Sequence, residues 1–356
     1  MQRKATALDV AKRAGVSRSA VSLVLNGRGD GNVAKESQDR IRQAASELKY
    51  SPNAIALSLR NQRTRVIGIV SDEVVVSPFD GNIIGGADDV ARAHGFVTVV
   101  MDTERDASRD ESAVETLLDR QVDGLMYVTV GLKPLDVPHG MLRVPSVLAN
   151  CFDNSPSPQL HHVIPDEVSG GREATEHLLQ LGHRDIAFLA GAATSPAVPL
   201  RIAGHREAMA RAAIPVREDR VFTAGWDIND GFHGAMGLLS ATERPTAIVC
   251  ANDRLAIGVA LAAARLGLAV PRDLSIMGYD DESRIAATMV PALTTMALPL
   301  REMGAAAMTM LLEQIEDRVQ TPTPRGGTGL ATNAGLETMV PCRLVVREST
   351  GPVPAL

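Results

Sequence analysis

Apolar residues recur at helical spacing over the first fifty positions of the chain. Within 17–27, Val21, Val24 and Leu25 fall at i, i+3 and i+4, which predicts a helix that buries them together. The opposite face of that helix would be polar except for one leucine; it carries Arg18, Ser19, Ser22 and Leu23. An apolar residue on a polar face needs an explanation.

The segment 6–25 predicts two short helices joined by a tight turn. Thr6 and Asp9 have the spacing of a capping box at the start of the first helix. Gly15 suits a turn that needs positive φ, and Ser17 suits the N-cap of the second helix. Small residues at the crossing favour a helix-turn-helix, and the alternative is an ordinary helical hairpin.

Two further helical segments follow. Apolar positions predict a third helix over about 35–48. Ser51 and Pro52 suit the N-cap and first position of another helix. The segment 53–59 is too short to be stable alone, so it requires a partner surface: a second copy, DNA or both.

From residue 66 the pattern changes to alternating strands and helices. Buried strands are predicted at 65–70, 96–103 and 122–128, with helices at 83–95 and 108–119 between them. Similar alternation continues through residue 281. The pattern predicts a parallel α/β architecture with right-handed crossovers, and the two runs of units predict two similar lobes.

Charge is distributed unevenly along the chain. Residues 1–65 contain 13 Lys and Arg against 5 Asp and Glu, whereas the remainder contains 23 against 37. A basic head on an acidic body favours a polyanion as the partner of the head alone, and the alternative is a solvated basic face.

Length and composition narrow the class of protein. The 356 residues favour two or three domains, and no apolar run approaches the length of a membrane span. The N-terminus lacks a signal peptide's apolar core, and the three cysteines lack metal-ligand spacing. Dinucleotide-binding, P-loop and nucleophile-elbow motifs are absent from the sequence. We therefore expect a cytoplasmic protein that is not an enzyme and has no cofactor, metal or membrane partner.

The head resembles the lactose-repressor (LacI/GalR) family. The motifs are "TALDVAKRAGVSRSAVSLVLN" and "ELKYSPNAIALSL". The resemblance implies that the second helix enters the major groove, and that paired linker helices wedge Leu59 into the minor groove. The implied DNA-binding residues are Thr6, Ser17, Arg18, Ser19, Ser22, Leu23, Asn26, Asn53, Ala56 and Leu59.

The head departs from the family pattern in three places. Ala20 replaces a usual threonine, which is a modest packing change. Leu23 replaces a common arginine, and a leucine can contact a thymine methyl but cannot hydrogen-bond guanine. The loop 27–32, "GRGDGN", is long, and Ala34 stands where a capping serine is common. This loop is expected either to loosen the third helix or to bring Arg28 near a phosphate.

The body resembles the effector domain of the same family over its whole length, through "ATEHLLQLGHRDIAFLAG", "CANDRLAIGVALAAARLGLAVPRDLSIMGYDD" and "PALTTMALPLREMG". The resemblance implies a two-lobed, periplasmic-binding-protein-like fold. The expected division is 1–50 for the helix-turn-helix domain, 51–62 for the hinge helix, 63–163 with 292–324 for lobe 1, and 164–291 with 325–350 for lobe 2. The Pro-, Gly- and Thr-rich stretch 321–338 exceeds the usual length and is predicted to be a flexible loop.

Candidate ligand-binding residues lie at predicted strand ends of the body. Arg201 and Asp280 match the cleft arginine and aspartate of the family, and the alternatives are a surface arginine and a solvated loop acid. Asn252 could bind the ligand or have a purely structural role, and Asp253 could cap the helix that follows. Trp226 could bind the ligand or be a core residue. The full predicted effector set is Ser77, Phe79, Asp80, Asn150, Arg201, Trp226, Asn252 and Asp280.

The sequence thus predicts a ligand-responsive, sequence-specific DNA-binding transcriptional regulator, most simply a homodimeric repressor. Its expected partners are a near-palindromic double-stranded operator and a sugar or sugar derivative bound between the lobes. Its expected location is the nucleoid in the cytoplasm. Two rival hypotheses are a transporter's solute-binding protein, which a signal peptide would favour, and a sugar-processing enzyme, which turnover of the bound sugar would reveal.

Overall fold

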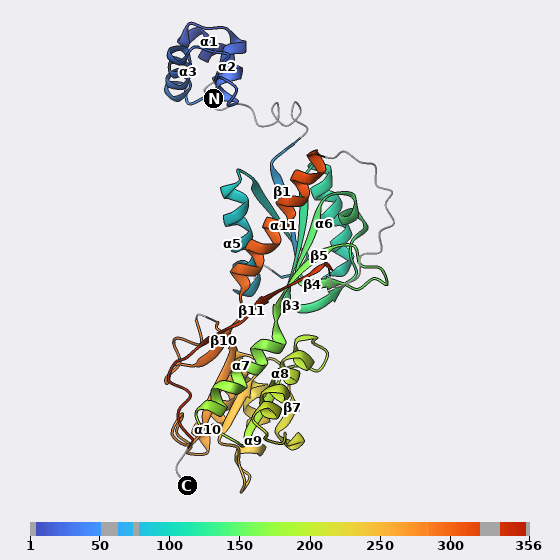
Figure 1. Ribbon diagram of the computed structural model, residues 1–356, viewed down its shortest axis with the longest axis vertical. Helices are drawn as coiled ribbons and strands as arrows, with labels where there is room; N and C mark the ends of the chain where they lie inside the picture. Colours follow the sequence, from blue (N-terminus) through green and yellow to red (C-terminus); the bar gives the residue numbers. More distant parts are fainter. Residues whose placement is uncertain (1–4, 51–62, 74–77, 283, 321–334, 354–356) are drawn as a thin grey trace. The chain divides into compact units, whose positions relative to one another are not determined.

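Two separate folding units make up the chain, Met1–Arg65 and Val66–Leu356, here called the head and the body. The computed structural model describes residues 5–50, 63–73, 78–282, 284–320 and 335–353 (Figure 1).

The head is a three-helix unit with its own core. Its helices are α1 (Ala7–Ala14), α2 (Arg18–Leu25) and α3 (Lys35–Glu47). Val10, Val21 and Ile41 come from the three helices and are each at most 1% exposed. Burial of this apolar cluster holds the three short helices together, since none is long enough to be stable alone.

Two six-stranded sheets with the same strand order form the body. The first sheet runs β11-β5-β4-β3-β1-β2 and the second β12-β10-β9-β8-β6-β7, so β1 to β5 correspond to β6 to β10 in position. Pairing is parallel except between β10 and β12. The predicted parallel architecture with two similar lobes is confirmed.

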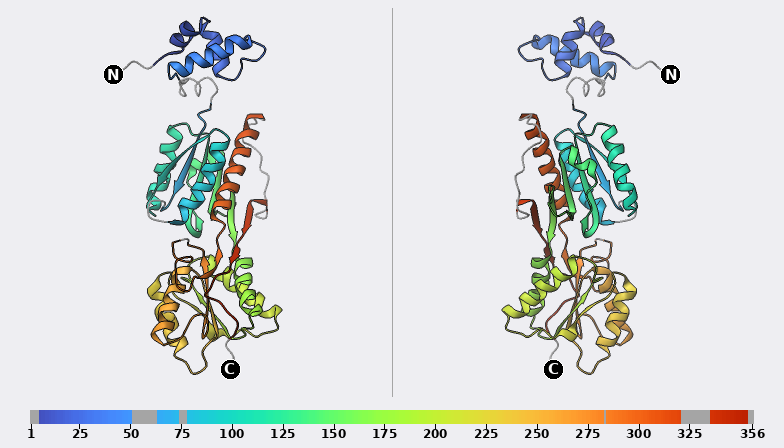
Figure 2. Two further views of the ribbon diagram at one scale, coloured as in Figure 1. Left: turned by 90° about the vertical axis from the view of Figure 1, so that its left-hand side faces the viewer. Right: turned by 90° about the vertical axis from the view of Figure 1, so that its right-hand side faces the viewer.

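Helices cover both faces of each sheet (Figure 2). The chain first builds most of the first sheet and then crosses to the second. The elements before this first crossing are β1 (Val66–Ser71), α5 (Pro78–Ala93), β2 (Val97–Asp102), α6 (Ala107–Asp119), β3 (Gly124–Leu135), η1 (His139–Arg143), β4 (Ser146–Asp153) and β5 (His161–Asp166). Those up to the second crossing are α7 (Glu167–Gln180), β6 (Ile186–Ala190), α8 (Ala197–Arg211), η2 (Glu218–Arg220), β7 (Val221–Thr223), α9 (Ile228–Leu239), β8 (Ala247–Cys250), α10 (Asp253–Arg265), β9 (Ser275–Asp280) and β10 (Thr294–Ala297). The last are α11 (Leu300–Gln320), β11 (Glu337–Pro341) and β12 (Arg343–Val345).

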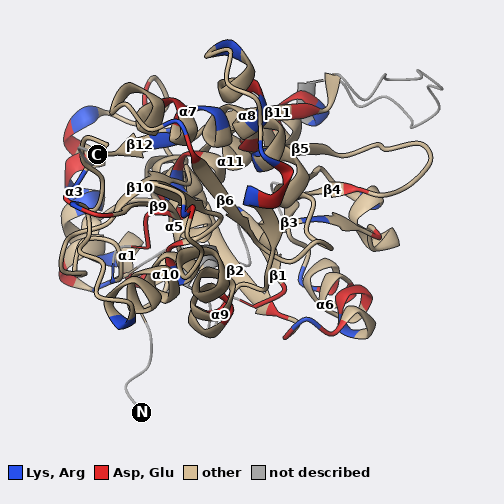
Figure 3. Ribbon diagram, turned by 90° about the horizontal axis from the view of Figure 1, so that it is seen from below, with Lys and Arg blue, Asp and Glu red and all other residues tan. Residues whose placement is uncertain are grey.

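In the first sheet, α5 and α11 share one core with Ile67 and Ile69 of β1, whereas α6 packs in another core with Val70 and Leu125. Alternate strand residues therefore serve opposite faces, as expected for a sheet that is buried on both sides. Acidic residues predominate on α6, which also carries Arg109 (Figure 3).

Sheet membership corrects the expected lobe boundaries. Residues 294–297 form β10, which pairs with β9 in the second sheet and not with the first, so the chain leaves this sheet only after residue 297. Residues 337–341 form β11, which pairs with β5 in the first sheet and not with the second. The chain therefore crosses between the sheets after β5, after β10 and between β11 and β12. Such short strands carry too little periodicity to reveal which sheet they join.

Candidate functional site

The turn between α1 and α2 has the predicted chemistry. The Thr6 hydroxyl accepts from the Asp9 amide, and the Asp9 carboxylate accepts from the Thr6 amide, which completes the capping box. Gly15 has φ 66°, and the Ser17 hydroxyl accepts from the Ala20 amide at 3.1 Å. These caps confirm the helix-turn-helix and fix the orientation of α2.

The outer face of α2 carries the predicted base-reading residues. Arg18 and Ser19 are exposed in its first turn. Asn26 donates from its side-chain amide to the Ser22 hydroxyl at 3.2 Å, so these two predicted contacts lie together one turn further on. Leu23 is half-buried, and within the described residues it is not among the apolar side chains that pack against the core of the head.

Hydrogen bonds of Gln38 tie the loop before α3 to that helix. The Gln38 side chain is 4% exposed, and its Nε2 donates to the Val33 carbonyl at 2.9 Å and to Asp30 Oδ1 at 3.2 Å. Gly27 and Gly31 have positive φ, which permits the tight path. The Gln38 side chain therefore anchors this loop to α3, although no side chain caps the helix at Ala34. Three predicted DNA contacts, Asn53, Ala56 and Leu59, lie outside the described residues.

A cavity of about 590 Å³ lies between the two sheets of the body. It is lined by residues of both, and five of the predicted effector residues are among them: Asn150, Arg201, Trp226, Asn252 and Asp280. Ser77 lies outside the described residues, and Phe79 and Asp80 lie in α5, where their side chains are not described. The cavity is at the carboxyl ends of the parallel strands, where open α/β sheets bind ligands.

Two glycines bring α7 and α8 into backbone contact and so set one wall of the cavity. A Cβ on Gly171 would lie 2.2 Å from the Arg201 carbonyl oxygen, and one on Gly204 would lie 2.0 Å from that of Val168. This close approach places Arg201 of α8 beside Glu167, the first residue of α7.

Arg201 and Glu167 form a buried, bidentate ion pair. The Arg201 Nε and Nη2 atoms each lie 2.7 Å from a Glu167 carboxylate oxygen, and the side chains are 5% and 2% exposed. The third nitrogen donates to the Ala251 carbonyl oxygen, and the guanidinium stacks on the Tyr279 ring at 3.7 Å. Burial is the largest single influence and would lower the pKa of Arg201, but Glu167, Tyr279 and Asp280 together outweigh burial and raise this pKa. Arg201 is therefore a buried cation with a partner and not the surface arginine of the alternative hypothesis.

Asp280 ends β9 with φ 106°, a backbone conformation that is uncommon outside glycine. Its Oδ1 lies 3.9 Å from Arg201 Nη1, too far for a hydrogen bond. Burial raises the pKa of Asp280 well above its usual range against the opposing charge of Arg201. This carboxyl group is not a solvated loop acid, and it borders the cavity with hydrogen-bonding capacity in reserve.

Asn252 and Trp226 form one unit on the wall formed by the second sheet. Asn252 is the N-cap of α10, and its Oδ1 accepts from the Leu255 amide at 2.7 Å. Its Nδ2 donates to the Trp226 carbonyl oxygen at 3.0 Å. The Trp226 ring is half-buried against Gly191, where a Cβ would lie 2.2 Å from the ring. Asn252 therefore has the structural role of the alternative hypothesis, since it caps α10. Asp253, the other candidate, is the first residue of that helix and not its cap.

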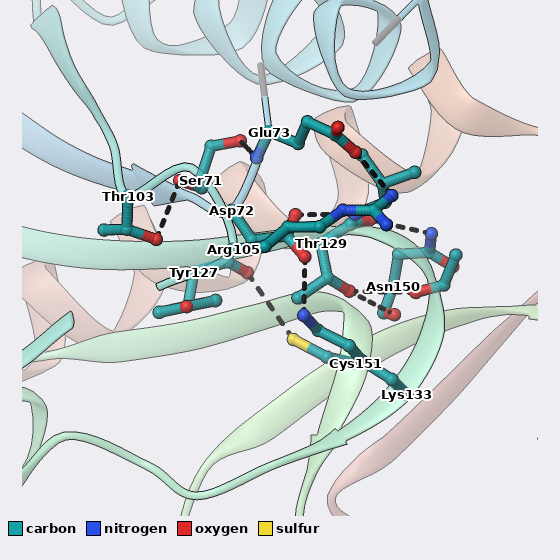
Figure 4. Close-up of polar contacts among 12 residues, drawn as sticks. Ser71, Asp72, Glu73, Thr103, Arg105, Tyr127, Thr129, Lys133, Asn150 and Cys151 are labelled. Carbon is teal, nitrogen blue, oxygen red and sulfur yellow. Dashed lines mark hydrogen bonds and ion pairs between the residues drawn. The ribbon is translucent and has the colours of Figure 1, made fainter. Parts of the chain in front are cut away.

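The first sheet supplies a polar wall, of which the sequence predicted Asn150 but not Asp72 or Lys133 (Figure 4). Asp72 follows β1 and is 3% exposed; its Oδ1 accepts from the Val130 amide at 2.8 Å, and its Oδ2 lies 2.5 Å from Lys133 Nζ. Asn150 has φ 60° and donates from Nδ2 to the Thr129 carbonyl oxygen at 2.9 Å.

Further lining residues were not predicted; they include Asp72, Arg105, Lys133, Glu167, Ser195, Asp227 and Arg254. Asp72 directly follows the apolar strand β1, and Glu167 directly follows β5; a position after a strand end is the signal that could have identified them. Lys133 carried no such signal, because β3 continues past the register shift between Val128 and Lys133, well beyond the apolar run.

The described part of the chain shows no sign of a metal-binding cluster or of a membrane-spanning helix. No group of three or more His, Cys, Asp or Glu side chains there could hold a metal ion. None of the described helices is both long and apolar enough to cross a membrane.

The head and body together define a class: a helix-turn-helix joined to a two-lobed ligand-binding fold. Residues 6–53 match the model of bacterial regulatory proteins of the lacI family, and residues 175–350 match a periplasmic binding protein-like domain. The chain is 32% identical over 353 residues to the HTH-type transcriptional regulator DegA of Bacillus subtilis, covering 98% of this chain and 99% of the relative. It is 34% identical to the HTH-type transcriptional repressor PurR of Vibrio campbellii, covering 88% and 93%.

Solved structures give the same result. The lac repressor dimer bound to operator and the anti-inducer ONPF superposes with a TM-score of 0.76 at 28% identity, covering 98% of this chain and 100% of that one. A complex of the transcriptional regulator CelR with cellobiose has a TM-score of 0.65 at 27% identity, covering 97% and 99%. The chain belongs to the lacI family of bacterial regulatory proteins. It is a ligand-responsive, DNA-binding transcriptional regulator.

Proposed function

We propose that the protein is a homodimeric repressor whose affinity for a near-palindromic operator changes when a sugar or sugar derivative binds in the cavity of the body. The cavity carries this proposal: it offers an aromatic ring, Trp226, beside amide and carboxyl groups from both sheets. An aromatic face surrounded by hydrogen-bonding groups suits a ring that bears hydroxyl groups. The CelR–cellobiose complex shows that a relative of similar fold takes a sugar.

The proposed mechanism is a shift between two arrangements of the lobes. Two of the three crossings between the sheets border the cavity, one at Glu167 and the other at Leu298 and Leu300. A ligand that contacts both walls stabilises one arrangement over the other, and this preference is the free energy available to change DNA affinity. The residues proposed to contact the ligand are those predicted above that line the cavity. In a dimer, two copies of α2 would read two half-sites.

Binding, and not turnover, is the proposed activity. The relatives are named as transcriptional regulators, which supports binding and not turnover as the activity. A protein that regulates transcription works at the chromosome, so the proposed place of action is the nucleoid in the cytoplasm.

The test begins by selecting high-affinity duplexes from a random pool with the full chain. A panel of sugars, sugar derivatives and nucleobases is then screened by thermal shift, because a bound ligand stabilises the folded state by mass action. The expected result is a two-fold-symmetric binding site and a stabilising sugar that changes the affinity for it. A stabilising ligand that leaves DNA affinity unchanged, or that is chemically converted, would contradict the proposal.

A further inference from the structure

The cations around the cavity share one feature: each already faces a carboxylate of this chain. Within the described residues the cationic lining side chains are Arg105, Lys133, Arg201 and Arg254. Their partners are Glu73, Asp72, Glu167 and Glu282, respectively. The cavity therefore contains positive groups without offering a vacant positive site.

Glu167 neutralises the most deeply buried of these cations. It accepts from two nitrogens along one edge of the Arg201 guanidinium, while the Ala251 carbonyl oxygen accepts from the third nitrogen and the Tyr279 ring covers one face. Tyr279 also donates its hydroxyl to Glu167 Oε2 at 2.8 Å, which orients the carboxylate further. An anionic ligand would compete with Glu167 for the charge of Arg201, and displacing Glu167 would leave that carboxylate buried without its partner.

On the opposite wall, Asp72 neutralises Lys133 in the same way. Its carboxylate is 4% exposed, and it is fixed by the Val130 amide on one oxygen and by Lys133 on the other. Beyond these pairs the lining adds carboxyl groups and no further cation in the described residues; Asp227 and Asp280 are both there. A ligand with a negative charge would lose its hydration and meet no unpaired positive group in return.

We propose that Glu167 and Asp72 are specificity-determining residues that make this cavity select an uncharged, hydroxyl-rich ligand and reject carboxylated or phosphorylated ones. The inference rests on the proposed function, because it takes this cavity as the effector site. Hydroxyl groups suit the cavity because they donate to carboxyl groups such as that of Asp280 and accept from amides.

Matched ligand series test the inference on the full chain. The probes are D-ribose with D-ribonate and D-ribose 5-phosphate, D-glucose with D-gluconate and D-glucose 6-phosphate, and cellobiose with cellobionate. Dissociation constants are measured by calorimetry at constant ionic strength. In each series that binds, the uncharged member is expected to bind about tenfold or more tightly than its anionic forms. An anion that binds the wild-type chain as tightly as its uncharged counterpart would overturn the inference and leave the proposed function intact.

Two substitutions test the named residues. Glu167→Gln releases Arg201, and Asp72→Asn releases Lys133, so each should shift the ratio of anionic to uncharged affinity toward the anion by about tenfold. Glu218→Gln is the control: it removes an equal charge from an exposed pair with Arg206 at 2.7 Å and should leave the ratio unchanged.

The possible outcomes distinguish a failure of this inference from a failure of the proposed effector-binding function. Circular dichroism establishes which variants fold. If Glu167→Gln does not fold, the inference is still tested by Asp72→Asn and by the relative affinities of the wild type for uncharged and anionic ligands. Unchanged ratios in the folded variants would show that these carboxylates do not set the preference. If no member of any series binds the wild type or the variants, the effector function proposed for this cavity is contradicted as well.

Discussion

Asn252 holds the Trp226 backbone at the start of α10: its Nδ2 donates to the Trp226 carbonyl oxygen at 3.0 Å while its Oδ1 caps the helix. One side chain thus fixes both a helix terminus and the segment that presents the only tryptophan of the chain. The ring is further positioned by Gly191, which leaves it room on the side of the second sheet. This arrangement makes Trp226 a preorganised part of the cavity wall, and preorganisation lowers the entropic cost of binding.

Trp226→Ala is therefore expected to weaken effector binding while leaving operator affinity nearly intact. An aromatic contact in a cleft is worth about 1 kcal/mol or more, which corresponds to a several-fold rise in the dissociation constant. Calorimetry measures the effector affinity, and fluorescence anisotropy measures the operator affinity. Trp226→Phe keeps an aromatic face and should retain much of the affinity. Normal effector titration by the alanine variant would show that the ring is structural only.

The fragment 62–356 is expected to fold and bind effector without binding DNA. The apolar clusters of the body contain no residue of the head, and the head has a separate core. Circular dichroism and calorimetry check the fold and the effector affinity, and anisotropy with the selected duplex checks DNA binding. Protection of operator DNA by this fragment would refute the division of labour between the two units.

A pH dependence of stability is expected from Asp253, which is 1% exposed. Burial raises its pKa to about 7, despite hydrogen bonds from Thr295 and the Glu282 amide at 2.7 Å. Because the folded state holds this proton more tightly than the unfolded state, the stability that it contributes is lost as pH rises from about 4 through about 7. Buried histidines such as His205, whose pKa burial lowers to about 4, act in the opposite direction below about pH 6.5.

The measurement covers pH values from about 6.5, where half of the unfolded histidines are still protonated, to about 8, and comparison of the wild type with a variant cancels the contribution of the histidines. Thermal melting of the wild type should show a decline with pH that Asp253→Asn reduces. Asp273→Asn is the matched control, because a hydrogen bond from Arg272 lowers the pKa of this partly buried carboxyl to about 2, and its contribution changes only in acid. An equal decline in wild type and Asp253→Asn would mean that Asp253 does not hold the proton.

Sequence reasoning predicted the elements with strong periodicity and the caps with a local pattern, such as Thr6 with Asp9. It placed Arg201, Trp226 and Asp280 at the cavity, because the resemblance fixed their positions along the chain. It missed Glu167, whose importance depends on α7 and α8 meeting at two glycines far apart in sequence. It also misplaced β10 and β11, since strand pairing is a long-range property that a four- or five-residue segment does not encode.

Leu59→Ala is expected to lower affinity for the selected operator much more than affinity for random DNA. The residue lies outside the described part of the chain, and the expectation follows from its match to the family's minor-groove leucine. Non-specific binding depends on phosphate contacts, which an apolar side chain does not make. Anisotropy with both duplexes at one salt concentration measures the two losses, and equal losses would contradict the wedge role.

Leu23→Arg is expected to change which base the protein prefers. Two interpretations of Leu23 compete: contact with a thymine methyl in the major groove, or packing against Ile41 and its neighbours. Val21 and Val24 supply the inward face of α2, and within the described residues Leu23 is not among the side chains packed on the core that contains Ile41. The placement favours the first interpretation.

An arginine at this position can hydrogen-bond guanine through two acceptors, and a good bidentate contact discriminates by about 1–3 kcal/mol. The variant should therefore move the preference at one symmetric position of each half-site from A·T toward G·C. Selection from randomised duplexes, performed on both proteins, measures this shift. Leu8→Arg is the control for added charge, because Leu8 is 51% exposed on α1 and an extra charge there strengthens binding to any sequence. If Leu23→Arg only strengthens binding, with unchanged preference at every position, Leu23 does not face the bases.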